Sequence, residues 1–82
     1  MKCEYQYIRF HRADKQNPKT WIYLARTKDL RGVLLGVVKW YAQWRQYGFY
    51  PEEGTVFEKT CLRDIKNFCI DLNERQKLRC KK

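Results

Sequence analysis

Acidic residues are scarce in this chain, and long apolar segments are missing. The 82 residues include 9 Asp and Glu against 18 Lys and Arg, which gives a formal net charge of +9. The longest apolar run, residues 33–38, is far shorter than the roughly 20 residues that a membrane-spanning helix needs. The first ten residues contain no apolar signal-peptide segment. We therefore expect no membrane span and a cytoplasmic protein.

Motifs for catalysis and for metal binding are also missing. The four cysteines, Cys3, Cys61, Cys69 and Cys80, include no C-x-x-C pair, the close spacing that zinc ligands usually show. The chain has one histidine, His11, no glycine-rich phosphate loop and no recognisable pair of catalytic carboxylates. We expect no enzyme, no metal and no cofactor. The cysteines are expected to be free thiols that pack as small apolar residues in a reducing compartment.

What the chain does contain is apolar and aromatic residues together with its positive charge. A hydrophobic fraction of 44% and an aromatic fraction of 16% indicate one folded domain over residues 1–82, near the lower size limit for a self-sufficient core. A net charge of this size attracts polyanions. Nucleic acid, DNA or RNA, is the first candidate partner, an acidic protein the second and an anionic membrane surface the third. Plain solubility is the interpretation that needs no partner.

Four segments are rich in aromatic and β-branched residues, which is typical of β-strands. They are residues 5–12, 21–27, 33–41 and 44–50. Polar turns separate the first three, and we expect Gly32 to adopt a positive φ in the second turn. In the third strand Gly36 predicts a bulge or close packing. Pro51 ends the fourth strand because it has no N–H to donate.

From about Glu58 the hydrophobic period changes from two to 3.6, which predicts an amphipathic helix of roughly 15–18 residues. Its apolar positions are Cys61, Leu62, Ile65, Phe68, Cys69 and Leu72, and its polar positions are Lys59, Arg63, Asp64, Lys66, Asn67 and Asp71. Thr55 with Glu58, or Thr60, is expected to cap it. A basic, fraying segment is expected at about 74–82. The predicted class is α+β: a four-stranded antiparallel sheet followed by one C-terminal helix packed on one face.

Residues 39–51 (KWYAQWRQYGFYP) hold two of the three tryptophans and three of the six tyrosines. With residues 42–43 as a two-residue turn, the expected pairs are Tyr41–Trp44, Trp40–Arg45, Lys39–Gln46 and Val38–Tyr47. Side chains alternate along a strand. The face toward the helix is then expected to carry Leu34, Gly36, Val38, Trp40, Arg45, Tyr47 and Phe49. The opposite face is expected to carry Leu35, Val37, Lys39, Tyr41, Trp44, Gln46 and Tyr50.

We predict that the face left uncovered by the single helix binds a ligand. Aromatic rings stack on bases, while Lys and Arg neutralise phosphates. The candidate binding residues are Arg9, Arg12, Lys39, Tyr41, Trp44, Arg45 and Gln46. Packing is the alternative role for the aromatic members, because strand aromatics usually pack. We assign Trp40, Tyr47 and Phe49 to the core and His11 to the surface.

A K-W-Y-x-x-W-R-x-Y-x-F-x-P block at 39–51 is followed by GTVF at 54–57 and CLRDI at 61–65. With these features, residues 33–72 resemble small proteins of phages, prophages and other viruses, a group without a settled function. This chain has Ala42-Gln43 where the group leads us to expect a Gly-Pro-like turn. The resemblance implies a virus-encoded accessory protein that acts inside the host cell, and it supplies no catalytic residues.

Three functions remain open at this point. The first is a non-enzymatic, virus-encoded nucleic-acid-binding protein. The second is an inhibitor of a host defence system, an anti-CRISPR or other anti-defence protein. It would use the same surface on an acidic or nucleic-acid-binding host protein, since Trp, Tyr and Arg dominate such interfaces. The third is a homodimer in which the uncovered faces pair and the aromatic residues are structural.

Overall fold

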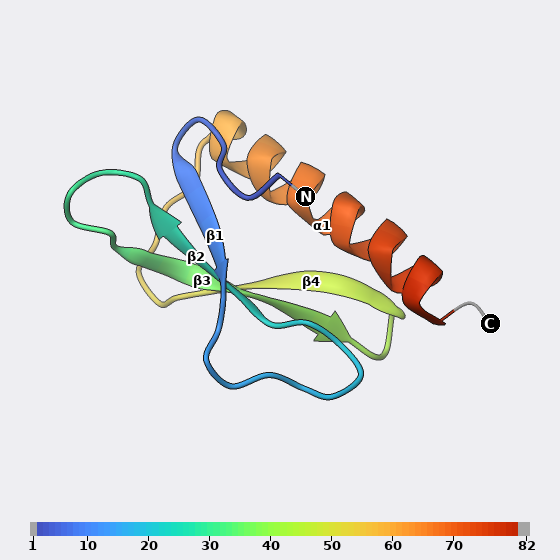
Figure 1. Ribbon diagram of the computed structural model, residues 1–82. Coiled ribbons are helices and arrows are strands. Elements are labelled where there is room, and N and C mark those ends of the chain that lie inside the picture. The colour runs from blue at the N-terminus through green and yellow to red at the C-terminus, as the bar shows by residue number, and fades with distance from the viewer. Residues whose placement is uncertain (1, 81–82) are drawn as a thin grey trace.

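The structure is a computed structural model that describes residues 2–80 (Figure 1). Its elements are β1 (Ile8–Arg12), β2 (Tyr23–Thr27), β3 (Leu34–Tyr41), β4 (Gln46–Pro51) and α1 (Lys59–Cys80). The strands form one antiparallel sheet in the order β1-β2-β3-β4. Figure 1 shows α1 lying along one side of this sheet. The α+β class and the single packed helix expected from the sequence are therefore confirmed.

The core lies between α1 and the sheet, with Phe68 of the helix at its centre. The Phe68 ring is fully buried and stacks on the ring of Phe10 in β1 at a centroid distance of 4.0 Å. Tyr23 of β2 and Tyr5 meet the same ring edge-on, at 5.0 and 6.5 Å. Each such ring pair contributes about 0.5–1.5 kcal/mol beyond the area that it buries. Phe68 thus joins the helix to the first two strands.

Register decides which side chains face α1. Phe10 lies opposite Ala25 and Arg9 opposite Arg26. Ala25 pairs with Gly36 of β3 but Arg26 with Leu34, so that Leu35 is an additional residue at a bulge. A bulge re-aims the side chain that it carries. Leu35, expected on the face away from the helix, packs against the core cluster instead. Leu34, expected on the helix face, lies opposite Arg26 on the other face.

The β3–β4 hairpin has a four-residue loop, residues 42–45, and not the expected two-residue turn. Arg45 closes the loop with a positive φ of 51°. The observed pairs are Tyr41–Gln46, Trp40–Tyr47, Lys39–Gly48, Val38–Phe49 and Val37–Tyr50. All four expected pairings are therefore wrong by two residues. Because the error is an even number, the strand residues from Gln46 onward keep the faces predicted for them.

Two glycine predictions are confirmed. Gly32 has a φ of 55° in the turn between β2 and β3. Gly36 is closely packed, because a Cβ there would lie 2.5 Å from the carbonyl oxygen of Tyr50 and 2.6 Å from the Phe49 ring. No larger residue fits at position 36 without displacing β4.

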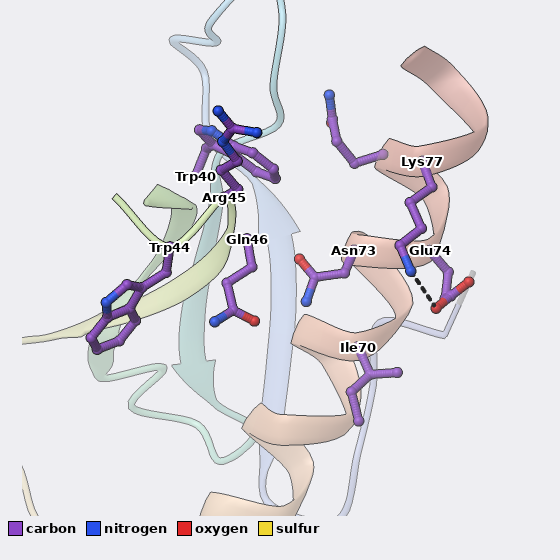
Figure 2. Close-up of a pocket in the computed structure, with 9 residues that line it drawn as sticks. Trp40, Trp44, Arg45, Gln46, Ile70, Asn73, Glu74 and Lys77 are labelled. Atoms are coloured by element: carbon purple, nitrogen blue, oxygen red, sulfur yellow. Dashed lines mark ion pairs between the residues drawn. The ribbon is translucent and has the colours of Figure 1, made fainter. Parts of the chain in front are cut away.

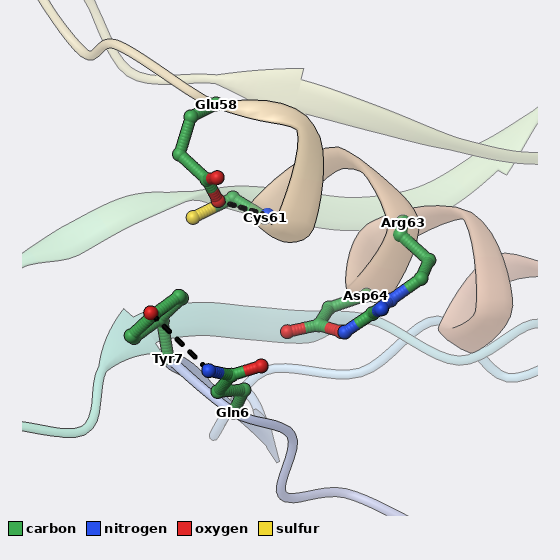
Figure 3. Close-up of polar contacts among 6 residues, drawn as sticks. All are labelled: Gln6, Tyr7, Glu58, Cys61, Arg63 and Asp64. Atoms are coloured by element: carbon green, nitrogen blue, oxygen red, sulfur yellow. Dashed lines mark hydrogen bonds and ion pairs between the residues drawn. The ribbon is translucent and has the colours of Figure 1, made fainter.

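Helix α1 begins directly after Glu58, and the Glu58 carboxylate caps it (Figure 3). Its Oε1 accepts a hydrogen bond from the backbone N–H of Cys61 at 2.7 Å. Hydrogen bonds from the backbone N–H groups of Thr60 and Cys61 lower the pKa of Glu58. Neither expected cap is used: Thr60 is already helical, and Thr55 donates its hydroxyl to the Glu52 carbonyl at 2.7 Å. A carboxylate at this position suits the partial positive charge of a helix N-terminus.

The helix has 22 residues, longer than expected, and it continues through the segment predicted to fray. Gln76, in that segment, is buried. Its side chain accepts a hydrogen bond from the Tyr47 hydroxyl at 2.7 Å and donates one to the Lys19 carbonyl at 3.1 Å. The segment expected to fray is thus helical in the structure up to Cys80, and residues 81–82 lie outside the described part of the chain.

The loop between β1 and β2 is attached to the same end of the helix. Arg79 donates to the carbonyl of Pro18 at 2.9 Å, and its guanidinium lies 4.8 Å from the centre of the Trp21 ring. The backbone N–H of Trp21 donates to the Tyr47 hydroxyl at 3.1 Å. These contacts draw the loop to the helix side of the sheet.

Asp64 was expected on the wet side of the helix, but it is 2% exposed. It lies one turn before Phe68, so it shares the helix face that packs on the sheet. Arg63 reaches Oδ1 at 3.6 Å (Figure 3), and Oδ2 has no hydrogen-bond partner among the described residues. The Tyr5 ring meets Phe68 edge-on, so the segment before β1 lies beside this part of α1. Burial, with smaller effects of Asp71 and Asp64, raises the pKa of Tyr5.

Candidate functional site

The face of the sheet opposite α1 is the candidate site, and we call it the open face. Its strand residues are Arg9, His11, Leu24, Arg26, Leu34, Val37, Lys39, Tyr41, Gln46, Gly48 and Tyr50. Each of these residues is partly or fully exposed. On the helix side at the same level of the sheet, Phe10, Ala25 and Val38 are buried at 1% exposure or less. The solvated face is thus the one predicted from the sequence.

Positive charge dominates the open face. None of the four strands, all within the described residues, contains an Asp or a Glu. Arg9, Arg26 and Lys39 project from it. Glu4 lies 2.8 Å from Arg9, but both side chains are more than half exposed, so solvent screens the pair. The open face therefore carries a net positive charge.

Arg26 is held in a fixed position at the β1–β2 end of the open face. Its Nε donates to Nε2 of His11 at 3.2 Å, and its Nη1 donates to the carbonyl of Gly32 at 3.0 Å. The first bond requires His11 to be neutral at that nitrogen. A guanidinium has five N–H donors, so these two bonds leave others for an anion. Arg9 lies directly across from Arg26 on β1.

The β3–β4 end of the open face is aromatic. Tyr41 meets Trp44 and Tyr50 edge-on, at centroid distances of 4.9 and 6.4 Å. The Lys39 ammonium lies 4.5 Å from the centre of the Tyr50 ring. Trp44 is 72% exposed. With Gly48 these rings line a hollow of about 200 Å³ on the open face.

A second hollow, of about 470 Å³, lies between the hairpin tip and α1 (Figure 2). Trp40, Trp44, Arg45 and Gln46 border it from the hairpin, and Ile70, Asn73 and Lys77 are among the residues that border it from the helix. The polar helix residues are already engaged: Asn73 Oδ1 accepts from the backbone N–H of Tyr47 at 2.8 Å, and Lys77 lies 3.8 Å from Glu74. Trp44 and Gln46 therefore line both hollows, whereas Arg45 lines the groove beside α1 (Figure 2).

The structure brings five of the seven predicted binding residues onto the open face. They are Arg9, Lys39, Tyr41, Trp44 and Gln46. Arg12 is not among them, because it alternates with Phe10 and lies opposite Tyr23 on the helix side. Arg45 borders the groove beside α1.

Two members of the open face, Arg26 and His11, were not selected from the sequence. Knowing which residues of β1 and β2 lie opposite each other would have identified both. Arg26 lies opposite Arg9 and next to His11 across the β1–β2 pair. Register is not fixed by the composition of two short strands. Tyr50 was placed on the correct face but was not chosen as a binding residue.

Two of the cysteines, Cys61 and Cys69, have thiols that keep their protons. Cys3, Cys61 and Cys69 are free thiols. Burial raises the pKa of Cys69 to about 11, and burial also raises the pKa of Cys61. A thiol that keeps its proton at neutral pH is a weak nucleophile and a weak metal ligand. Among the side chains of residues 2–79 no group of three or more His, Cys, Asp or Glu could hold a metal ion.

No family model, curated protein or solved structure matches this chain. No helix within residues 2–80 is long and apolar enough to cross a membrane. The interpretation of the open face therefore depends on its charge, its exposure and its geometry.

Proposed function

We propose that the protein binds nucleic acid through the open face. The observation that carries this proposal is the segregation of charge. All nine acidic residues lie outside the strands, whereas Arg9, Arg26 and Lys39 project from the open face. The net charge of +9 adds a long-range attraction for polyanions.

The arrangement divides the contacts between the two ends of the sheet. Phosphates lie over Arg9 and Arg26 at the β1–β2 end and beside Lys39, where guanidinium and ammonium groups neutralise them. Bases lie at the β3–β4 end against Tyr41, Trp44 and Tyr50. Stacking on an aromatic side chain contributes about 1–3 kcal/mol per base and tolerates any sequence. This is binding without a chemical step.

The cellular setting of the proposal comes from the resemblance of residues 33–72 to small phage and viral proteins. It supports a virus-encoded accessory protein that acts in the cytoplasm of the host cell. An acidic host protein is the competing partner, because it would be attracted by the same cations. Exposed Trp44 with neighbouring Arg and Tyr side chains is the composition of a protein-binding hot spot.

Two charge-matched double variants test the proposal. Arg9→Gln with Lys39→Gln removes two exposed cations from the open face, and Lys59→Gln with Lys66→Gln removes two exposed cations from α1. Binding is measured by fluorescence anisotropy with a labelled single-stranded DNA, and with the RNA of the same sequence, over a salt series. We expect the open-face variant to bind at least tenfold more weakly. Its slope of log K against log salt should fall by about 1.4, or 0.7 per lost contact.

The α1 variant should stay within about twofold of the unmodified protein. Equal losses in the two variants, or no binding of the unmodified protein at low salt, would contradict the proposal. A nuclease-treated lysate tests the competing function. If the unmodified protein retains an acidic host protein and the open-face variant does not, binding of a host protein replaces nucleic-acid binding as the function. Sedimentation at two concentrations detects a homodimer that buries the open face.

A further inference from the structure

Gly48 differs from the other three glycines because nothing in the fold requires a glycine there. Gly32 and Gly54 have φ angles of 55° and 80°, which other residues rarely adopt. Gly36 has no room for a Cβ. At Gly48 the φ angle is ordinary, and a Cβ would meet only the Cβ of Tyr41 at 3.7 Å, a normal van der Waals distance. A larger residue is therefore compatible with the backbone and with the packing at position 48.

A glycine in the middle of a strand weakens the strand, because it has more backbone entropy to lose and no side chain to pack. Because Gly48 has no side chain, the hollow of about 200 Å³ on the open face stays unfilled at this position. Lys39 is directly opposite Gly48, yet its ammonium lies over the Tyr50 ring at 4.5 Å. The strand opposite therefore leaves the space over Gly48 open.

The lining of the hollow suits a flat group with hydrogen-bonding edges. The Tyr41 ring is inclined at 79° to the Trp44 ring and at 67° to the Tyr50 ring, so the rings form walls in different directions. Tyr41 is held in place, since its hydroxyl donates to Gln43 Oε1 at 2.6 Å. Gln46 lines the same hollow with an exposed amide, which can donate to and accept from the edge of a base.

We propose that the hollow over Gly48 receives one unpaired nucleobase, so that the open face prefers single-stranded nucleic acid to duplex. This inference rests on the proposed function. In a duplex both faces of each base are covered by stacking, whereas a single strand can turn a base out against aromatic side chains. Lys39, beside the hollow, takes the nearest phosphate, and Arg26 and Arg9 take phosphates further across the sheet.

Filling the hollow tests the proposal. Gly48→Val places a β-branched side chain in it, and Trp44→Ala removes an exposed wall. The probe is a fluorescein-labelled DNA of mixed sequence and about 12 nucleotides, used as a single strand and as a duplex at one low salt concentration. We expect the unmodified protein to bind the single strand at least tenfold more tightly than the duplex, with quenching of tryptophan fluorescence. Gly48→Val should lose about tenfold in single-strand affinity with little change for duplex, and Trp44→Ala should lose several-fold.

The outcomes separate this inference from the proposed function. If Gly48→Val binds the single strand as tightly as the unmodified protein, while Arg9→Gln with Lys39→Gln binds weakly, the base site is overturned and the open-face interface stands. Equal affinity of the unmodified protein for single strand and duplex also overturns the base site. No binding of either probe overturns both. Thermal unfolding checks that Gly48→Val is folded, and if it is not, Trp44→Ala decides the outcome.

Discussion

At the scale of single residues, buried tyrosines hold this small core together. Tyr47 is 3% exposed, and its hydroxyl accepts from the Trp21 backbone and donates to the side chain of Gln76. Tyr5 is 7% exposed and meets Phe10 and Phe68 edge-on. A tyrosine buries a large apolar ring and still offers a hydroxyl for a hydrogen bond, which suits a chain with little apolar volume.

Tyr5 gives a prediction about alkaline stability. Burial, with a smaller effect of the Asp71 carboxylate, raises the pKa of Tyr5 to about 12 from its ordinary value of 10. Between pH 10 and 12 the folded protein keeps this proton while the unfolded chain loses it. The raised pKa therefore contributes fully to the stability of the fold below pH 10. This contribution disappears as the pH rises from 10 to 12, by about 2 kcal/mol in the free energy of unfolding. Tyr5→Phe should reduce this loss, measured by urea unfolding at pH 8, 10 and 11.5.

Tyr5→Phe compared with Tyr41→Phe isolates the effect, since Tyr41 lies on the open face outside the buried core. Stability curves of unmodified protein and Tyr5→Phe that stay parallel up to pH 12 would show that Tyr5 does not titrate with a raised pKa.

At the scale of elements, the sequence predicts all five elements, but β1, β2 and β4 begin later in the structure, at Ile8, Tyr23 and Gln46, and α1 ends later than expected, at Cys80. Residues 42–43 carry no Asn-Gly signal, and the chain makes a longer loop that Arg45 closes in the left-handed region. The helix has no apolar stripe after Leu72, and it continues because Gln76 and Arg79 bind the β1–β2 loop. The first error is local to residues 42–45, whereas the second comes from contacts between segments far apart in the sequence.

The end of α1 supplies the second stability prediction. Gln76→Ala removes the hydrogen bonds to the Tyr47 hydroxyl and to the Lys19 carbonyl, and it should lower the free energy of unfolding by about 1–3 kcal/mol. Leu78→Ala, on the exposed side of the same turn, is the control and should change stability by about 0.5 kcal/mol or less.

Hydrogen exchange of the last two turns of α1 shows where the Gln76→Ala effect lies. Amides of residues 74–79 should exchange faster in Gln76→Ala, while those around Phe68 keep most of their protection. Unchanged exchange in residues 74–79 would mean that the helix end does not depend on the β1–β2 loop.

At the scale of the whole molecule, the chain separates its charges by structure. The acidic residues occupy the loops, the helix and the segment before β1, and the strands carry cations alone. Strand alternation predicted which face of the β3–β4 hairpin is solvated, and the two-residue register error did not change it. Alternation alone did not show that Arg12 lies on the helix side, because the pairing of β1 with β2 decides which residues of β1 face α1. The hollow over Gly48 could not be predicted from the sequence. A glycine in a strand indicates only a less stable strand until its neighbours in space are known.

Amide chemical-shift mapping of the ¹⁵N-labelled protein with a single-stranded DNA of about 12 nucleotides would locate the nucleic-acid contacts directly. We expect the largest chemical-shift changes on the open face, at Lys39, Gly48 and Tyr50, with smaller changes at Arg9 and Arg26. The amides around Lys59 and Lys66 of α1 should be nearly unchanged. Changes concentrated along α1, or a spectrum that does not respond to excess DNA at low salt, would contradict the claim that the open face binds nucleic acid.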